Sequence, residues 1–98
     1  MLFMVRFTDH ADRLAVRQAH SAGHMAWLAA HADQVRVGGP LRVDPYGAAV
    51  GAMWLVEAAS AAEIERLLAG EPFWVNGLRA GVEILEWRKV VPAGPATL

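Results

Sequence analysis

Residues 2–8, LFMVRFT, alternate between two faces that are both largely apolar. One face carries Phe3, Val5 and Phe7, and the other carries Leu2, Met4 and Arg6. A period of two residues is typical of a β-strand. A strand with apolar side chains on both sides is typical of the interior of a sheet that is covered on both faces. The sequence therefore predicts an inner strand at the start of the chain.

The segment that follows this strand predicts a long helix and then a hairpin. Residues 12–32 are rich in Ala, Leu, Gln and Arg, which are good helix formers. Residues 34–37 and 49–57 predict two strands joined by a long loop. We expect Gly38-Gly39-Pro40 to kink or end the first of these strands, because proline cannot donate a ladder hydrogen bond.

The second half of the chain predicts another helix and a last strand. Ser60-Ala61-Ala62-Glu63 matches a capping box, which indicates a helix that begins there and continues through Leu68. Pro72 is expected to open one further short helical turn. Residues 79–91 predict the closing strand, and residues 92–98 contain two prolines and a glycine, which predicts a C-terminal tail.

The predicted element order is β-α-β-β-α-β, which indicates an α+β, ferredoxin-like fold within a single domain at residues 1–91. Two helices would cover one face of a four-stranded antiparallel sheet. We expect the other face to be apolar as well, with Trp54 and Trp87 among its side chains. Since large exposed apolar patches mark interaction sites, this face predicts a homodimer in which two sheets pack together.

The composition narrows the possible partners. The 98 residues include 55% hydrophobic residues, and the net charge is −1, from 9 basic and 10 acidic side chains. Without a basic excess, we expect no nucleic-acid partner. No run of residues approaches the length of a membrane span, and the N-terminal segment does not resemble a signal peptide. The chain has no cysteine, so we expect a cytoplasmic protein.

Three histidines are expected on one face of the long helix. His20, His24 and His31 fall within about 40° of one another at helical spacing, and Arg17 lies close to the same face. Two imidazoles four residues apart can bind a metal ion. However, this pattern has no adjacent glutamate and no obvious third ligand, so no metal site is predicted. The remaining alternatives are a general acid or base, and a histidine that only caps apolar packing.

Glu71 is the most informative carboxylate. It precedes Pro72 and Phe73 at a corner of the chain, away from the predicted helix surfaces. A carboxylate between apolar side chains is expected to lose solvent, which would raise its pKa and allow it to hold a histidine in one orientation. The alternative is an exposed loop acid.

Several short motifs, in order, resemble the YciI-like (YCII-related) family of the dimeric α+β barrel superfamily. The resemblance extends roughly over residues 1–91. His24–Leu28 (HMAWL) resembles the family's His-Leu-x-x-Leu, and Gly39–Leu41 resembles its Gly-Pro-Leu turn. Glu71–Phe73 resembles its Asp-Pro-Phe segment, and Val82–Trp87 resembles its closing strand. Each motif alone is weak, and their common order makes the resemblance stronger.

The resemblance implies a homodimeric α+β barrel with a cleft that contains a histidine–aspartate pair. The histidine corresponds to His24, and Glu71 occupies the aspartate position. Ser21 stands where the family often has an arginine, and Arg17, one turn earlier, is the candidate replacement. A relative within this family is a dehydrochlorinase that acts on a chlorinated hydroxyquinol, and other superfamily members are isomerases or monooxygenases.

These observations predict a small-molecule enzyme of the lyase or isomerase type that uses no cofactor. His24 would transfer a proton, and Glu71 would orient its ring. The predicted substrate-binding residues are Arg17, His20, Trp27 and Phe73. The first alternative is a non-catalytic module that binds a small metabolite or serves as an accessory dimerisation domain. The second is an interaction scaffold, which predicts a filled interior beside His24.

Overall fold

The first strand forms where the alternation predicts it. In the computed structural model, which describes all of residues 1–98, β1 spans Leu2–Asp9. Phe3, Val5 and Phe7 are buried on one face, while Leu2 and Met4 are half-buried on the other. The strand pairs in antiparallel fashion with a neighbour on each side. The prediction of an inner strand is therefore confirmed.

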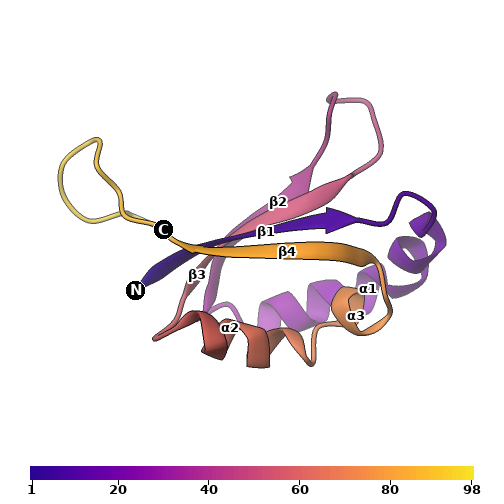
Figure 1. Cartoon of the computed structure of the whole chain (residues 1–98), viewed down its shortest axis with the longest axis horizontal. Helices are drawn as coiled ribbons and strands as arrows, with labels where there is room; N and C mark the ends of the chain where they lie inside the picture. The colour runs from indigo at the N-terminus through magenta and orange to yellow at the C-terminus, as the bar shows by residue number, and fades with distance from the viewer.

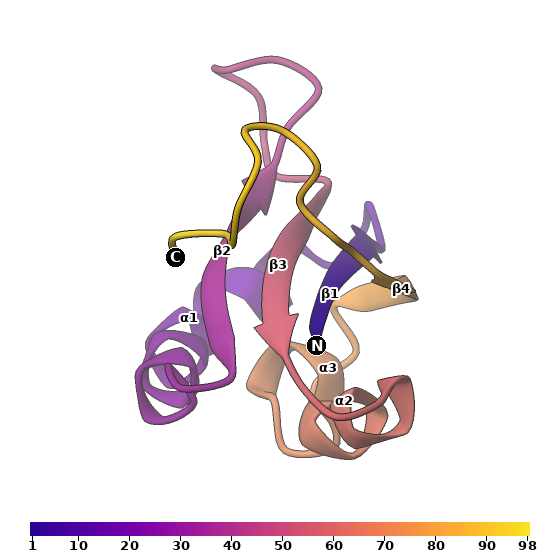
Figure 2. The same cartoon turned by 90° about the vertical axis from the view of Figure 1, so that its left-hand side faces the viewer.

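The remaining elements build a four-stranded antiparallel sheet with helices on one face (Figures 1 and 2). The further strands are β2 (Val35–Leu41), β3 (Gly51–Glu57) and β4 (Arg79–Glu86), and the helices are α1 (Leu14–Ala30), α2 (Ala61–Leu68) and α3 (Pro72–Val75). The strand order is β2-β3-β1-β4. This is the predicted ferredoxin-like α+β fold, with the short α3 added before β4. None of the helices has the length and apolar character needed to cross a membrane.

The alternative that Gly38-Gly39-Pro40 ends its strand is wrong. β2 continues through all three residues to Leu41, and the one register shift of this strand lies before them, between Val35 and Val37. Proline is tolerated here because β2 is an edge strand, which pairs on one side only. Continuation of β2 brings Pro40 opposite Ala52 and makes the Gly-Gly-Pro segment one wall of the cleft described below.

The core lies between the sheet and the helices, and it contains Trp54. The expectation that Trp54 contributes to the uncovered face is wrong, because its side chain is 1% exposed and faces the helices. Its ring packs edge-on against Phe7, with 4.6 Å between the centroids, and lies 5.8 Å from the ring of Trp27. Residues 53–56 of β3 are all bulky and apolar, so the sequence pattern alone does not distinguish its two faces.

The uncovered face of the sheet is nevertheless apolar. Met4 and Leu55 are opposite each other in the β1–β3 register, and Leu85 of β4 is opposite Met4 on the other side. Leu85 is 52% exposed. Trp87 is half-buried beside Leu2, whose carbonyl accepts its backbone amide, as expected for this face. The sheet therefore has apolar side chains on both sides, although helices cover only one.

The predicted cap of the second helix forms, with one difference. Ser60 Oγ accepts a hydrogen bond from the backbone amide of Glu63, 3.2 Å away. The Glu63 carboxylate reaches back one residue further than expected and accepts the amide of Ala59 at 2.8 Å. Its other oxygen accepts from the side chain of Gln34 at 3.0 Å, which fixes α2 against the start of β2.

Replacement of Gly38 by alanine should destabilise the fold. The added Cβ would lie 2.6 Å from Cδ1 of the buried Trp54, so the large indole ring would have to shift. Overpacking of this kind costs about 1–3 kcal/mol of unfolding free energy, measurable by urea denaturation. Gly39→Ala is the matched control, since its Cβ would meet nothing within 4 Å. Equal stability of the two variants would contradict the packing described here.

Candidate active site

The structure brings His24 of α1 and Glu71 into direct contact. Nδ1 of His24 lies 2.5 Å from Oε1 of Glu71, although 47 residues separate them in sequence. The His24 side chain is 12% exposed, whereas the Glu71 side chain is fully buried. The alternative of an exposed loop acid at position 71 is therefore wrong. The imidazole stands between a buried carboxylate and a part of the surface that solvent reaches.

The corner before α3 holds Glu71 in place. Glu71 is the N-cap of α3, and its Oε2 accepts a hydrogen bond from the backbone amide of Trp74 at 2.8 Å. Pro72 occupies the first position of the helix, where its fixed φ angle and missing N–H are favourable. Both carboxylate oxygens are thus engaged, one by the backbone of α3 and one by the side chain of His24.

The pKa of Glu71 lies below its usual value, contrary to the prediction of a raised pKa. Burial alone raises the pKa, as expected. The hydrogen bond from His24, the backbone amides of Phe73 and Trp74, and the charge of His24 together outweigh this effect. Glu71 is therefore ionised at neutral pH and can only accept hydrogen bonds. It follows that Nδ1 of His24 carries a hydrogen, and that Nε2 is the atom free to take up or release a proton.

Phe73 restrains the imidazole from the side. The two rings stack with 4.0 Å between their centroids and an angle of 16° between their planes. Phe73 is itself 1% exposed, because α3 directs it into the protein interior. The stacking and the bond to Glu71 act in different directions, so together they fix both the position and the tilt of the His24 ring.

A second group of charged residues lies next to Phe73, and it contains the predicted Arg17 together with Asp9 and Arg79, which were not predicted. Asp9 bridges two arginines: its Oδ1 accepts from Arg79 Nη1 at 2.7 Å, and its Oδ2 accepts from Arg17 Nη2 at 2.6 Å. The exposed fractions of the Asp9, Arg79 and Arg17 side chains are 4%, 1% and 23%. The Arg79 guanidinium also lies 4.5 Å from the ring centroid of Phe7. Its Nε is buried without a hydrogen-bond partner.

A topological signal for this group exists in the sequence. The first and last strands of a ferredoxin-like sheet are antiparallel neighbours, so the end of one lies beside the start of the other. Asp9 ends β1, Arg79 begins β4, and the two residues are register partners. Opposite charges at these two positions predict an ion pair. The ion pair is buried because Phe7 and Phe73 pack over it, and this packing cannot be read from the sequence.

His24 opens onto a cleft of about 310 Å³. The lining residues come from α1 (Arg17, Ser21, His24, Met25 and Leu28), β2 (Gly38, Gly39 and Pro40), β3 (Ala52 and Trp54), α3 (Phe73) and β4 (Arg79). Of the predicted site residues, the structure thus brings together His24, Glu71, Arg17 and Phe73. The scaffold alternative, which predicted a filled interior at this place, does not match the structure.

His20 and Trp27 do not line this cleft. His20 is half-buried on α1, one turn before His24. Trp27 stacks on His31, with 4.1 Å between ring centroids, and on Trp54 in the core. The structure contains no group of three or more His, Asp or Glu side chains placed to hold a metal ion.

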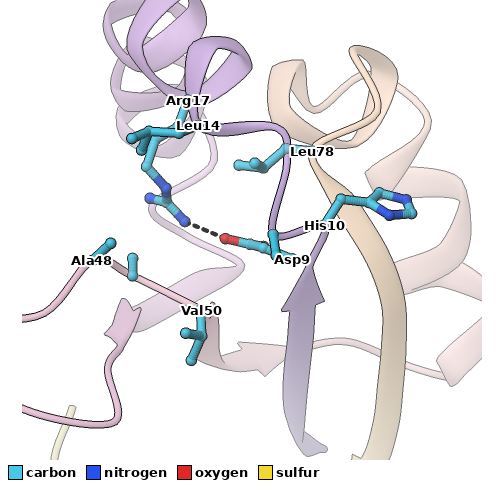
Figure 3. A pocket seen from close by; sticks show the side chains of 9 residues that line it. Asp9, His10, Leu14, Arg17, Ala48, Val50 and Leu78 are labelled. Carbon is cyan, nitrogen blue, oxygen red and sulfur yellow. Dashed lines mark hydrogen bonds and ion pairs between the residues drawn. The ribbon is translucent and has the colours of Figure 1, made fainter.

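A second cavity, of about 240 Å³, is lined by the Arg17–Asp9 ion pair (Figure 3). Its lining is mostly apolar and includes Leu14, Val50 and Leu78. The His10 side chain, which also borders it, projects to the opposite side from Arg17 in Figure 3. Arg17 lines both cavities and separates one from the other.

The fold and this site define a ferredoxin-like α+β domain with a histidine–carboxylate pair in a cleft. The profile of the YCII-related domain matches residues 1–88, so the chain belongs to the YCII-related family. This agrees with the resemblance drawn from the sequence motifs. No curated protein matches the sequence.

Two solved structures share the fold, and both proteins belong to the dimeric α+β barrel superfamily. One is TftG, the 5-chloro-2-hydroxyhydroquinone dehydrochlorinase from Burkholderia phenoliruptrix, in complex with 2,5-dihydroxybenzoquinone. It is 29% identical, with a TM-score of 0.81 over 90% of this chain and 94% of that chain. The other is a variant of SnoaB, a cofactor-independent oxygenase from Streptomyces nogalater. It is 19% identical, with a TM-score of 0.54 over 94% of this chain and 96% of that chain.

Replacement of Glu71 by glutamine should remove a pH-dependent part of the stability. Because the folded-state pKa of Glu71 is lowered from 4.5, its contribution is complete above that pH and is lost as the pH falls through the folded value. At pH 7 we expect Glu71→Gln to be less stable by about 1.5–3 kcal/mol, the usual worth of hydrogen bonds to a charged group. The difference should shrink below pH 4.5.

Urea denaturation across this pH range measures the effect. Glu65→Gln, at an exposed position of α2, is the matched control and should show no such convergence. A stability difference for Glu71→Gln that is constant with pH would contradict the assignment of an ionised carboxylate to Glu71.

Proposed function

We propose that this protein is a small-molecule enzyme of the lyase or isomerase type in which His24 transfers a proton. The observation that carries the proposal is the bond between Nδ1 of His24 and the buried, ionised Glu71, at the wall of a cleft. This arrangement leaves one ring nitrogen available to a ligand and fixes the other, as a general acid or base requires.

The proposed reaction acts on a keto form of the substrate and begins when Nε2 of His24 accepts a proton from a ring hydroxyl or from a carbon next to the carbonyl group. The electron pair of the broken O–H or C–H bond moves into the conjugated ring, and Glu71 balances the charge of the imidazolium that forms. Departure of a leaving group, with its bonding electrons, from the saturated ring carbon conjugated with that position completes an elimination. Alternatively, return of the proton to a different atom completes an isomerisation. Neither route requires a redox step.

The cleft favours a substrate of about one aromatic ring. Its apolar walls include Met25, Leu28, Trp54 and Phe73, and Arg17 supplies the most exposed guanidinium. The similarity to a dehydrochlorinase that was solved with a dihydroxybenzoquinone supports this substrate class and the elimination route. Since one fold serves many reactions, the chemistry still depends on the residues in this chain.

We also propose that the protein acts as a homodimer formed through the uncovered face of its sheet. Leu2, Met4, Met53, Leu55 and Leu85 lie on that face, where no helix covers them. Two copies packed face to face would bury these side chains, and C2 symmetry is the commonest arrangement for such a pair.

The alternative function is a non-catalytic module that binds a small metabolite. Two observations favour it. Ser21 lines the cleft where the family often has an arginine, and Glu71 stands in place of the family's aspartate. A binding module would keep the cleft and have no need of proton transfer by His24.

Replacement of His24 by alanine distinguishes the two functions. The assay is chloride release from 5-chloro-2-hydroxyhydroquinone, with binding of 2,5-dihydroxybenzoquinone measured in parallel. For a proton-transfer enzyme, kcat should fall about 10²- to 10⁴-fold. His10→Ala, whose ring lies outside the cleft, should keep the wild-type rate. Binding that persists in His24→Ala, with no turnover by the wild-type protein, would instead support the binding module.

The proposed dimer can be tested by a charge placed on the uncovered face. Leu85→Glu should convert the dimer to a monomer, because a carboxylate would be buried without a partner at the centre of the interface. Val75→Glu, at an equally exposed position on the helical side, should remain dimeric. Light scattering coupled to gel filtration measures both masses. A monomeric wild-type protein would refute this arrangement.

A further inference from the structure

The ionisable groups that line the His24 cleft are all hydrogen-bond donors or potential donors. They are Arg17, His24 and Arg79. The two carboxylates of the neighbourhood stand behind them: Asp9 borders only the second cavity, and Glu71 is fully buried and borders neither. A ligand in the cleft therefore meets positive charge and N–H groups without an accompanying carboxylate.

The positive charge is only partly balanced inside the protein. Arg17 and Arg79 share the single carboxylate of Asp9, so one positive charge of this group has no counterpart. Each guanidinium has five N–H donors, and each uses one nitrogen to donate to Asp9. The Nε of Arg79 is buried with no partner at all, although its side chain is only 1% exposed. Each guanidinium therefore keeps N–H groups that have no acceptor within the protein, and both side chains line the cleft.

The two guanidiniums are held in place before any ligand binds. Arg79 lies over the rings of Phe7 and Phe73, at 4.5 and 5.3 Å from their centroids, and Arg17 lies 5.2 Å from the centroid of Phe73. The same Phe73 ring stacks on His24. One aromatic side chain therefore sets the spacing between the arginines and the proton-transferring imidazole. Such preorganisation reduces the entropy lost when a ligand is bound.

We propose that Arg17 and Arg79 form an anion-binding subsite of the His24 cleft, and that the ligand is a one-ring compound that carries an ionised oxygen. The subsite rests on the proposed function, because it names the substrate class of the same cleft. A planar guanidinium matches an oxyanion on a planar ligand better than an ammonium group does. The ionised oxygen lies at the arginines, and the reacting carbon of the ring lies toward His24.

A pair of related quinones tests the charge requirement. The hydroxyls of 2,5-dihydroxybenzoquinone are vinylogous carboxylic acids and ionise below neutral pH, whereas its dimethyl ether has no ionisable group. Calorimetric titration at pH 7 should show tighter binding of the ionised quinone. Arg17→Gln should weaken its binding about 10- to 100-fold, the effect of losing one charge-assisted hydrogen bond, and should leave the ether unaffected.

Three further variants complete the test. Arg36→Gln removes an exposed arginine of β2 outside both cavities, so the affinity should not change. Arg79→Lys keeps the charge but loses the planar guanidinium, so its affinity for the ionised quinone should fall. If this variant does not fold, the Arg17→Gln variant alone decides the test. Ala48→Leu fills part of the second cavity and should leave binding unchanged. Loss of binding in Ala48→Leu would move the ligand to that cavity and overturn the proposal.

The outcomes separate this proposal from the proposed function. Binding is measured without turnover, and His24→Ala should retain most of its affinity for the ionised quinone. Equal affinity of wild-type protein and Arg17→Gln, equal affinity for the two quinones, or no binding of the ionised quinone would overturn the subsite. Turnover that depends on His24 would stand unaffected by any of these results. Conversely, charge-dependent binding with no turnover would retain the subsite and refute the enzyme.

Discussion

The bond between His24 and Glu71 is the interaction on which the architecture of the site depends. Moving a carboxylate into the protein interior costs several kcal/mol, and this cost is offset only by hydrogen-bond donors close to the carboxylate. Glu71 has such donors in the imidazole of α1 and the first amides of α3. The same contact joins two helices that are far apart in sequence, directs Phe73 beneath the imidazole and sets one wall of the cleft. The geometry of the candidate site therefore rests on one buried charge.

Asp9 is a second buried carboxylate that is stabilised by close hydrogen-bond donors, at the edge of the site. It ends β1, Arg79 begins β4, and their pairing ties the ends of two neighbouring strands together. Arg17 completes the group from α1. Phe73 lies between the two charged groups, with the imidazole stacked on it and both guanidiniums near it. The proposed proton-transferring and anion-binding parts of the cleft thus share one aromatic support, which makes their relative geometry a property of α3.

The sequence predicted most of the fold because alternation in β1 and the Ser60 cap are local signals. It failed for Trp54, since β3 is bulky on both faces, and for β2, since only its place at the sheet edge makes Pro40 acceptable. His24 and Glu71 were singled out by helical spacing and by position at a corner, the family resemblance paired them, and their catalytic roles stay predictions. The direction of the Glu71 pKa shift could not be predicted, because it depends on counting donors that only the folded chain provides.

The two carboxylate oxygens of Glu71 accept hydrogen bonds from two different partners, His24 and the backbone amide of Trp74. This double contact limits which residues can replace Glu71 in evolution. Aspartate is a favoured helix cap, but it is shorter by one methylene group. An aspartate that kept its bond to Trp74 would fall short of His24 unless α1 moved closer to α3. The length of the acid and the separation of the two helices are therefore expected to vary together among relatives. Exchange of this residue alone between family members would show strong epistasis.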